Sequence, residues 1–327
     1  TPRPVVDRVA YATRHGTAEA QLYRPSARGP HPGVVVCLGV VPFGVEHPQV
    51  PRLGEALARA GLAVLLHWSP AMRDLRIEPE DADDIGSAFE ALVARPEIDP
   101  ARSGLIGTCV GGAAALIAAS RPRIRDRVRF VFAYAPYASM WTFARDIASA
   151  SRARDGTREP WDVDQLTRRV YVRSVTSLVE GDERAALRDA CAERRERACV
   201  EARSETAKAI LPLLTALDVA GADAALRRLP APLRERLDAM SPLTHLGGIR
   251  APLVAIVHDR DDGVIPVSES RALRDVLAGR DGVRYTELTA FRHLDPAKSG
   301  ASPLALAREF VRFAGAVYPM VRASTAP

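Results

Sequence analysis

Asparagine is absent from the 327 residues of this chain, and lysine is almost absent. Only Lys208 and Lys298 are lysines, so nearly all of the 45 basic residues are arginine. The arginines lie among acidic residues along the whole chain, and the formal net charge is only +5. Because nucleic-acid binding requires clustered positive charge, we expect no nucleic-acid partner. GC-rich codon use is a simpler explanation of the arginine excess.

Long apolar runs are also missing. A membrane-spanning helix needs about 18 or more consecutive apolar residues, and no run in the sequence approaches that length. The opening residues do not have the basic and apolar regions of a secretory signal peptide. We therefore expect no association with a membrane.

Cysteine is scarce, and no pair has the C-x-x-C spacing of zinc or thioredoxin-like sites. Cys191 and Cys199 lie in a predicted helix at a separation of about 12 Å along its axis, which is too far for a disulfide. Cys37 lies in an apolar run, where cysteine acts as a small hydrophobic residue. This usage predicts a cytoplasmic protein without disulfides.

Short apolar strands alternate with amphipathic helices through most of the chain. Residues 5–24 alternate loosely and predict antiparallel edge strands, whereas the later apolar runs are typical of strands buried on both faces. These strands are predicted at 33–38, 62–66, 102–108, 128–135, 253–258 and 283–288. Helices are predicted at 53–60, 81–94, 111–120, 268–278 and from 303 onward. Asp99-Pro100 is expected to break the chain before the third strand. The alternation predicts an α/β fold with a mostly parallel central sheet flanked by helices.

This alternation stops between residues 138 and 240, where no buried strand is predicted. In the first helical segment of this region, Val163, Leu166 and Val170 mark one face. The helical segments are predicted at 161–179, 182–217, 222–229 and 233–240. The region exceeds an ordinary loop several-fold in length, so we interpret it as a helical cap inserted into one core. The predicted core comprises residues 1–137 and 241–327.

The most specific motif is Gly107-Thr108-Cys109-Val110-Gly111-Gly112, between a predicted strand and an alanine-rich helix. A G-x-nucleophile-x-G turn at a strand-to-helix junction is a nucleophile elbow, in which a sharp turn requires small neighbours. Here cysteine occupies the nucleophile position. Because the start of a helix favours a thiolate, the motif predicts Cys109 as a nucleophile.

A nucleophile of this kind needs a base, and the base needs an orienting acid. The strand at 253–258 leads into an acidic loop in which Asp262 precedes Gly263-Val264-Ile265-Pro266. We take Asp262 as the acid, with Asp259 and Asp261 as alternatives. His293 is the only histidine after Cys109 that also follows this loop, so it is the candidate base.

These residues resemble those of the α/β-hydrolase superfamily, and the resemblance covers most of the chain outside the insertion. The elbow Gly107-Thr108-Cys109-Val110-Gly111-Gly112 is similar to that of the dienelactone-hydrolase-like branch, which uses a Cys-Asp-His triad. The resemblance implies an α/β-hydrolase fold and a triad of Cys109, Asp262 and His293. It also implies an oxyanion hole formed by the backbone N–H groups of Val110 and of Val40 or Val41.

The implied reaction is hydrolysis of an ester, lactone or thioester through an acyl-enzyme on Cys109, without a metal or an organic cofactor. Dienelactone hydrolases carry a glutamate where this chain has Gly39-Val40-Val41, and they lack a large insertion, so we expect a different substrate. Two alternatives stay open. Polyhydroxyalkanoate synthases have a similar elbow and would transfer an acyl thioester to an alcohol. A non-catalytic binding protein on a hydrolase fold is the other.

Aromatic residues lie at the junction of the predicted core and insertion. Tyr134, Tyr137 and Trp141 are candidates for lining a substrate pocket, and packing within the insertion is the alternative. The insertion itself also carries Phe143, Trp161 and Tyr171. His67 ends a predicted core strand, at the edge where open sheets bind ligands, and suits packing equally well. A small ester-like substrate is the expected partner, and the sequence leaves a homodimer open.

Overall fold

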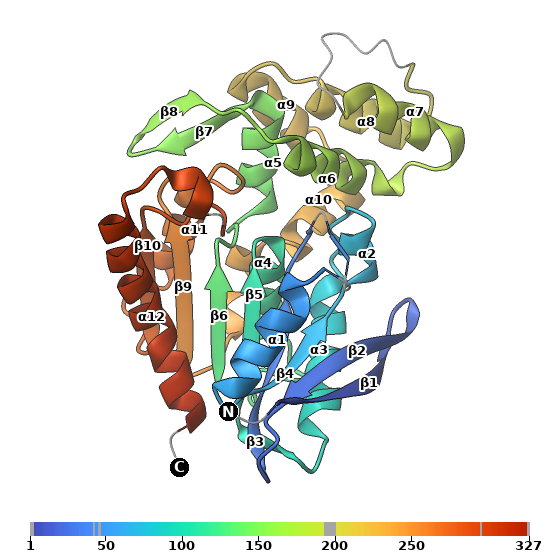
Figure 1. Ribbon diagram of the computed structural model, residues 1–327. Coiled ribbons are helices and arrows are strands. Elements are labelled where there is room, and N and C mark those ends of the chain that lie inside the picture. The colour runs from blue at the N-terminus through green and yellow to red at the C-terminus, as the bar shows by residue number, and fades with distance from the viewer. Residues whose placement is uncertain (1–2, 42, 45–46, 193–200, 295, 326–327) are drawn as a thin grey trace.

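The structure is a computed structural model that describes residues 3–41, 43–44, 47–192, 201–294 and 296–325 (Figure 1). The prediction about Cys199 lies outside these residues. Cys37, Cys109 and Cys191 are free thiols. Within the described residues, no helix combines the length and the apolarity that crossing a bilayer requires.

An eight-stranded sheet forms the centre of the molecule (Figure 1). Its strands are β1 (Val5–Thr13), β2 (Gly16–Arg24), β3 (His31–Cys37), β4 (Ala63–His67), β5 (Ile98–Thr108), β6 (Phe130–Tyr134), β9 (Leu253–Asp259) and β10 (Val283–Leu288). They lie in the order β1-β2-β4-β3-β5-β6-β9-β10. β2 pairs antiparallel with β1 and with β4, and all other neighbours are parallel. The predicted edge strands and the mostly parallel sheet are thus confirmed.

The predicted break at Asp99-Pro100 is wrong, because β5 begins at Ile98 and includes both residues. The pairing with β3 shifts register here: Pro32 pairs with Asp99, and Val34 pairs with Gly104. Pro100 therefore lies in the irregular stretch between these two pairs. A proline there removes no hydrogen bond of the regular ladder, so it does not end the strand.

Helices cover both faces of the sheet (Figure 1). They are α1 (Gln49–Arg59), α3 (Asp81–Val93), α4 (Val110–Ala118), α11 (Val267–Val276) and α12 (Pro303–Thr325). α1 and α12 pack on one face, and α3, α4 and α11 pack on the other. A separate short helix, α2 (Pro70–Arg73), follows β4. The wholly buried strands β3, β4 and β6 are packed between these two layers, as continuous apolar runs predict.

The chain between β6 and β9 lies over the carboxyl ends of the strands (Figure 1). It contains α5 (Met140–Ser149), β7 (Ser151–Arg154), β8 (Thr157–Pro160), α6 (Gln165–Val175), α7 (Gly181–Cys191), α8 (Glu205–Leu214), α9 (Val219–Arg227) and α10 (Ala231–Ala239). Short 3₁₀ turns occupy Thr176–Leu178, Pro242–Thr244, Leu246–Gly248 and Pro296–Ser299. We call residues 138–240 the insertion, and its status as a separate unit stays a prediction.

Two expectations for the insertion need correction. β7 and β8 form a hairpin that was not predicted, because most of its residues are polar and none is fully buried, so they leave no apolar run. The single helix predicted at 182–217 is wrong as well. α7 ends at Cys191, residues 201–204 are not helical, and α8 begins at Glu205. Ser204 caps α8, because its side chain accepts a hydrogen bond from the Ala207 N–H.

Candidate active site

Cys109 is the single residue between β5 and α4, and its backbone is strained. Its φ is 57° and its ψ is −134°, a conformation that residues with a side chain rarely adopt. The Cys109 N–H donates a hydrogen bond of 2.8 Å to the Tyr134 carbonyl of β6, which anchors the turn to the sheet. The side chain is 9% exposed. These are the features of a nucleophile elbow.

Two glycines make this turn sterically possible. A Cβ atom on Gly107 would lie 2.2 Å from the Gly111 carbonyl oxygen, and a Cβ atom on Gly111 would lie 2.5 Å from the Cys37 carbonyl oxygen. Both distances are far below van der Waals contact with backbone atoms, which cannot move aside. The glycines that identify the motif in the sequence are therefore required by close packing of β5, α4 and β3.

Asp262 and His293 form a hydrogen-bonded pair near Cys109. The Asp262 Oδ2 atom accepts a hydrogen bond of 2.7 Å from His293 Nδ1. Its Oδ1 atom accepts from the backbone N–H groups of Val264 (2.7 Å) and Ile265 (3.0 Å). Burial opposes ionisation of this carboxyl, but His293 and His258 together hold its pKa well below the usual range. Asp262 is therefore a carboxylate with fixed orientation.

The two alternative acids have other partners. Asp261 forms an ion pair with Arg154 of β7, with Oδ1 and Nη2 2.6 Å apart. Asp259 joins two loops, since Oδ1 accepts from the Asp261 N–H (2.9 Å) and Oδ2 accepts from the Phe291 N–H (2.6 Å). Of the three aspartates, Asp262 is the one hydrogen-bonded to His293.

His293 lies in a strained loop between Arg292 and Leu294, whose φ angles are 49° and 59°. Burial alone would lower the pKa of its imidazole. Electrostatic interactions with Cys109 and with the Asp262 carboxylate, and the hydrogen bonds to both side chains, raise the pKa of His293 well above its ordinary value. The structure thus brings the three predicted triad residues together, with the histidine between the thiol and the carboxylate.

The residues considered for an oxyanion hole line the cavities that contact Cys109. Val110 is the first residue of α4, so its N–H has no acceptor within the helix. Val40 lines both cavities that contact Cys109, and Val41 lines one of them. The loop that contains Val40 and Val41 is hydrogen-bonded to the elbow, because Thr108 Oγ1 donates a hydrogen bond of 2.8 Å to the Leu38 carbonyl. The choice between Val40 and Val41 as the second donor stays a prediction.

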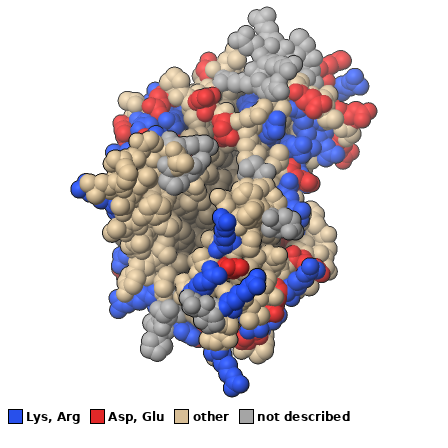
Figure 2. Space-filling view, viewed as in Figure 1, with Lys and Arg blue, Asp and Glu red and all other residues tan. Residues whose placement is uncertain are grey.

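Two cavities meet at Cys109. The inner pocket, a narrow cavity of about 40 Å³, lies between the elbow and helices α5 and α6 of the insertion. It is lined by Val40, Ile77, Cys109, Val110, Met140, Phe143, Ile147, Leu166, Thr167, Val170, Tyr171, Ser174, Val264 and Ile265. The outer cavity, with a volume of about 360 Å³, lies where the surface is hollowed between insertion and core (Figure 2). It is lined by Leu38, Val40, Val41, Phe43, Gln49, Val50, Leu53, Thr108, Cys109, Asp164, Leu166, Val264, His293 and Leu294.

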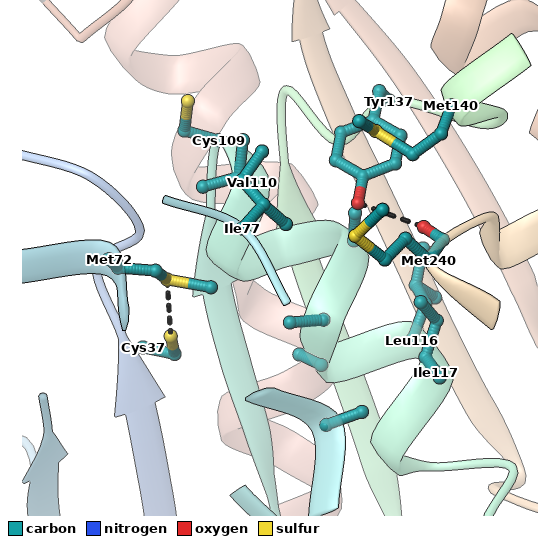
Figure 3. Packing of buried hydrophobic residues seen from close by; sticks show 14 of the residues in the cluster. Cys37, Met72, Ile77, Cys109, Val110, Leu116, Ile117, Tyr137, Met140 and Met240 are labelled. Atoms are coloured by element: carbon teal, nitrogen blue, oxygen red, sulfur yellow. Dashed lines mark hydrogen bonds between the residues drawn. The ribbon is translucent and has the colours of Figure 1, made fainter. Parts of the chain in front are cut away.

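The predicted substrate-binding aromatics do not line either cavity. The Tyr137 hydroxyl points away from Cys109 and donates to the Met240 carbonyl at 2.9 Å (Figure 3). The Tyr134 hydroxyl donates to the Arg292 carbonyl (3.1 Å), and Trp141 Nε1 donates to Asp238 (2.7 Å). All three use their polar ends to hold chain segments together, which corrects the prediction.

His67 is likewise a packing residue rather than a pocket residue. It is 2% exposed, and its Nδ1 lies 2.7 Å from the Tyr11 hydroxyl of β1. Burial lowers the pKa of His67 to about 4, so the ring is neutral at pH 7. The aromatics that do line the inner pocket are Phe143 and Tyr171, together with Leu166 and Val170. The last two lie on the α6 face that the sequence pattern marked.

The described residues contain no group of three or more His, Cys, Asp or Glu side chains that could hold a metal ion.

No family model matches the sequence, and no curated protein matches it at a significant level.

Solved structures with the same fold are found at low sequence identity. One is the acylaminoacyl peptidase of Pyrococcus horikoshii, with a TM-score of 0.58 and 14% identity over 98% of this chain. The present chain spans only 42% of that peptidase. A carboxyl esterase 2 from the fungus Tuber melanosporum has a TM-score of 0.56 at 14% identity, covering 99% of this chain and 89% of the esterase. A Klebsiella pneumoniae protein described as a dienelactone hydrolase has a TM-score of 0.50 at 14% identity, covering 97% and 99%. These likenesses, with the strand order, show that the chain has the α/β-hydrolase fold.

Proposed function

We propose that this protein is a cysteine-dependent hydrolase that cleaves an ester, lactone or thioester through an acyl-enzyme on Cys109. The observation that carries the proposal is the hydrogen-bonded pair of His293 and Asp262 beside a strained Cys109. In this proposal Cys109 is the nucleophile, His293 is the acid and base, and Asp262 orients the imidazole. The esterase and the dienelactone hydrolase among the structural neighbours support this reaction class.

In the first half-reaction, the Cys109 thiolate attacks the carbonyl carbon and forms a C–S bond. The electron pair of the C=O bond moves to the oxygen, which the N–H groups of Val110 and Val40 stabilise. When this tetrahedral intermediate collapses, the bond to the leaving group breaks. His293 gives its proton to the departing oxygen or sulfur, and the acyl group remains on Cys109.

In the second half-reaction, His293 is neutral and accepts a proton from a water molecule. The oxygen of that water attacks the acyl carbon, the C–S bond breaks, and Cys109 leaves as a thiolate. The carboxylic acid is released, and the thiolate and the protonated His293 are restored together. The raised pKa of His293 suits this resting state, because the charges that raise it are those of Cys109 and Asp262.

The test is intact-mass analysis after brief mixing with short-chain p-nitrophenyl esters and with an acyl thioester. We expect the wild-type protein to gain the mass of one acyl group and the Cys109→Ala variant to gain none. Release of free acid would then support hydrolysis, whereas formation of a new ester in the presence of an alcohol would support acyl transfer instead. If neither protein gains mass and the Cys109→Ala variant is as active as wild type, a non-catalytic role or another site replaces the proposal.

A further inference from the structure

The two cavities at Cys109 differ in one respect that bears on substrate orientation. His293 lines the outer cavity, whereas the inner pocket is lined by Cys109, Val110 and side chains of the insertion without His293. This inference rests on the proposed function, in which His293 donates a proton to the leaving group. A general acid must lie within hydrogen-bonding distance of the atom that it protonates. The leaving group therefore occupies the outer cavity, and the acyl group points into the inner pocket.

Each polar side chain of the inner pocket, apart from Cys109, already donates its hydroxyl hydrogen to another protein group. The Thr167 hydroxyl donates to Asp164, the residue that caps α6. The Tyr171 hydroxyl donates to the Leu213 carbonyl at 3.4 Å.

Ser174 is engaged twice, since its hydroxyl donates to the Val170 carbonyl (2.7 Å) and accepts from the Ile77 N–H (2.9 Å). The remaining side chains of the pocket, apart from the Cys109 thiol, are hydrocarbon or thioether groups. A polar group on the acyl chain would lose its hydration there and find no side-chain donor in return, at a cost of about 1–3 kcal/mol.

We propose that the inner pocket binds a hydrocarbon acyl chain without polar substituents, so that the substrates are simple alkanoyl esters or thioesters. Ile147 and Phe143 of α5 and Val170 of α6 form the walls. Val110, the residue after Cys109, and Ile77 line the pocket on the core side (Figure 3). Because side chains of the insertion and the core enclose the chain, the pocket also limits its length.

The experiment is a series of esters that share one leaving group and carry acyl chains from acetyl to dodecanoyl. We expect kcat/KM to rise about fourfold for each added methylene until the pocket is filled, which is the ratio equivalent to ~0.8 kcal/mol per buried CH₂. For acyl chains longer than the pocket can hold, kcat/KM should fall. An ester with a terminal hydroxyl on the acyl chain should be much slower than its unsubstituted counterpart. A flat series, or equal rates for the two, would overturn the proposal.

Two variants of Val170 move the pocket wall in opposite directions. Val170→Phe should shift the optimum to shorter acyl chains, and Val170→Ala should shift it to longer ones. The alanine variant creates no steric clash, so it tests the pocket even where the phenylalanine variant fails to fold. Val276→Phe is the matched control, because Val276 is 61% exposed on α11 and lines neither cavity. If the optimum stays fixed in both Val170 variants, the chain does not bind in this pocket.

A binding measurement tests the hydrocarbon pocket independently of the proposed hydrolysis reaction. The Cys109→Ala protein, which cannot form an acyl-enzyme, should bind octanoate at least tenfold more tightly than 8-hydroxyoctanoate in calorimetry. This preference without acylation of the wild-type protein would retain the pocket and reject the reaction. Acylation of the wild-type protein without the preference would retain the reaction and reject the hydrocarbon pocket.

Discussion

Asp261 and Asp262 are neighbours in the chain, but their carboxylates bind different partners. Asp262 accepts a hydrogen bond from His293 at 2.7 Å, and Asp261 pairs with Arg154 of the β7–β8 hairpin at 2.6 Å. Arg152 and Trp161 extend the contact between insertion and acidic loop, because they donate to the backbone carbonyls of Asp262 (3.0 Å) and Gly263 (2.9 Å). One aspartate thus faces the base, and the other links the loop to the insertion.

This division predicts different effects of two matched substitutions. Asp262→Asn removes the negative charge that orients His293 and stabilises its protonated form, so kcat should fall by about 100-fold or more. Asp261→Asn removes a partly exposed ion pair, which is worth about 0.2–1 kcal/mol, and kcat should change by less than about threefold. Steady-state kinetics on one ester checks both variants. The opposite order of effects would make Asp261 the acid.

The loop pattern ahead of Ile265 selected Asp262 from the sequence, but it could not show which partner Asp261 has in the fold. That partner is Arg154, which belongs to a hairpin 107 residues earlier in the chain. Sequence periodicity reports burial within one element. It does not report which polar side chains from distant elements meet, and β7 and β8 have too few buried residues to give a signal.

The pH dependence of acylation provides a second prediction. His293 must be protonated to release a poor leaving group, and its raised pKa keeps it protonated as the pH increases until that pKa is passed. With an alkyl ester, acylation should therefore decline only above the range in which an ordinary imidazole titrates, about pH 6.5. In Asp262→Asn one of the two anions that raise the pKa is gone, so the decline should begin at lower pH. Rapid-quench mass spectrometry of acyl-enzyme formation measures both profiles.

A p-nitrophenyl ester is the control for this assignment, because its leaving group departs without protonation. The alkaline decline should be absent with that ester. If the decline has the same midpoint in wild type and in Asp262→Asn, the charge of Asp262 does not set the protonation of His293.

Errors in the expected substrate pocket have a common physical origin. Tyr134, Tyr137 and Trp141 were selected because large aromatics at a junction can line a pocket. Each also carries a polar group that must find a partner when buried, and in each case that partner is the protein itself. Leu166 and Val170, which have no such group, remain available to line the cavity. The helical pattern in the sequence predicted that these two residues share one face of a helix. It could not predict whether that face contacts a cavity or packed side chains.

The identity of the nucleophile provides a third prediction. Cys109→Ser keeps the shape of the elbow but replaces a thiolate with a hydroxyl, which needs His293 to remove its proton during attack. We expect kcat/KM to fall by several orders of magnitude, with an unchanged circular-dichroism spectrum. The Cys109→Ala variant gives the background rate. A serine variant as active as wild type would contradict the thiolate mechanism.

The steric requirement at the elbow predicts the effect of a single methyl group on stability. In Gly107→Ala the new Cβ atom would lie 2.2 Å from the Gly111 carbonyl oxygen, so β5 and α4 must separate. Overpacking of this kind typically costs about 1–3 kcal/mol and occasionally more. Gly86→Ala is the matched control, since Gly86 lies inside α3 with no atom within 4 Å of its added Cβ, and helix propensity should stabilise that variant by about 0.5–1 kcal/mol. Urea denaturation measures both free energies of unfolding. A Gly107→Ala protein as stable as wild type would show that the contact between β5 and α4 is looser than its backbone distances indicate.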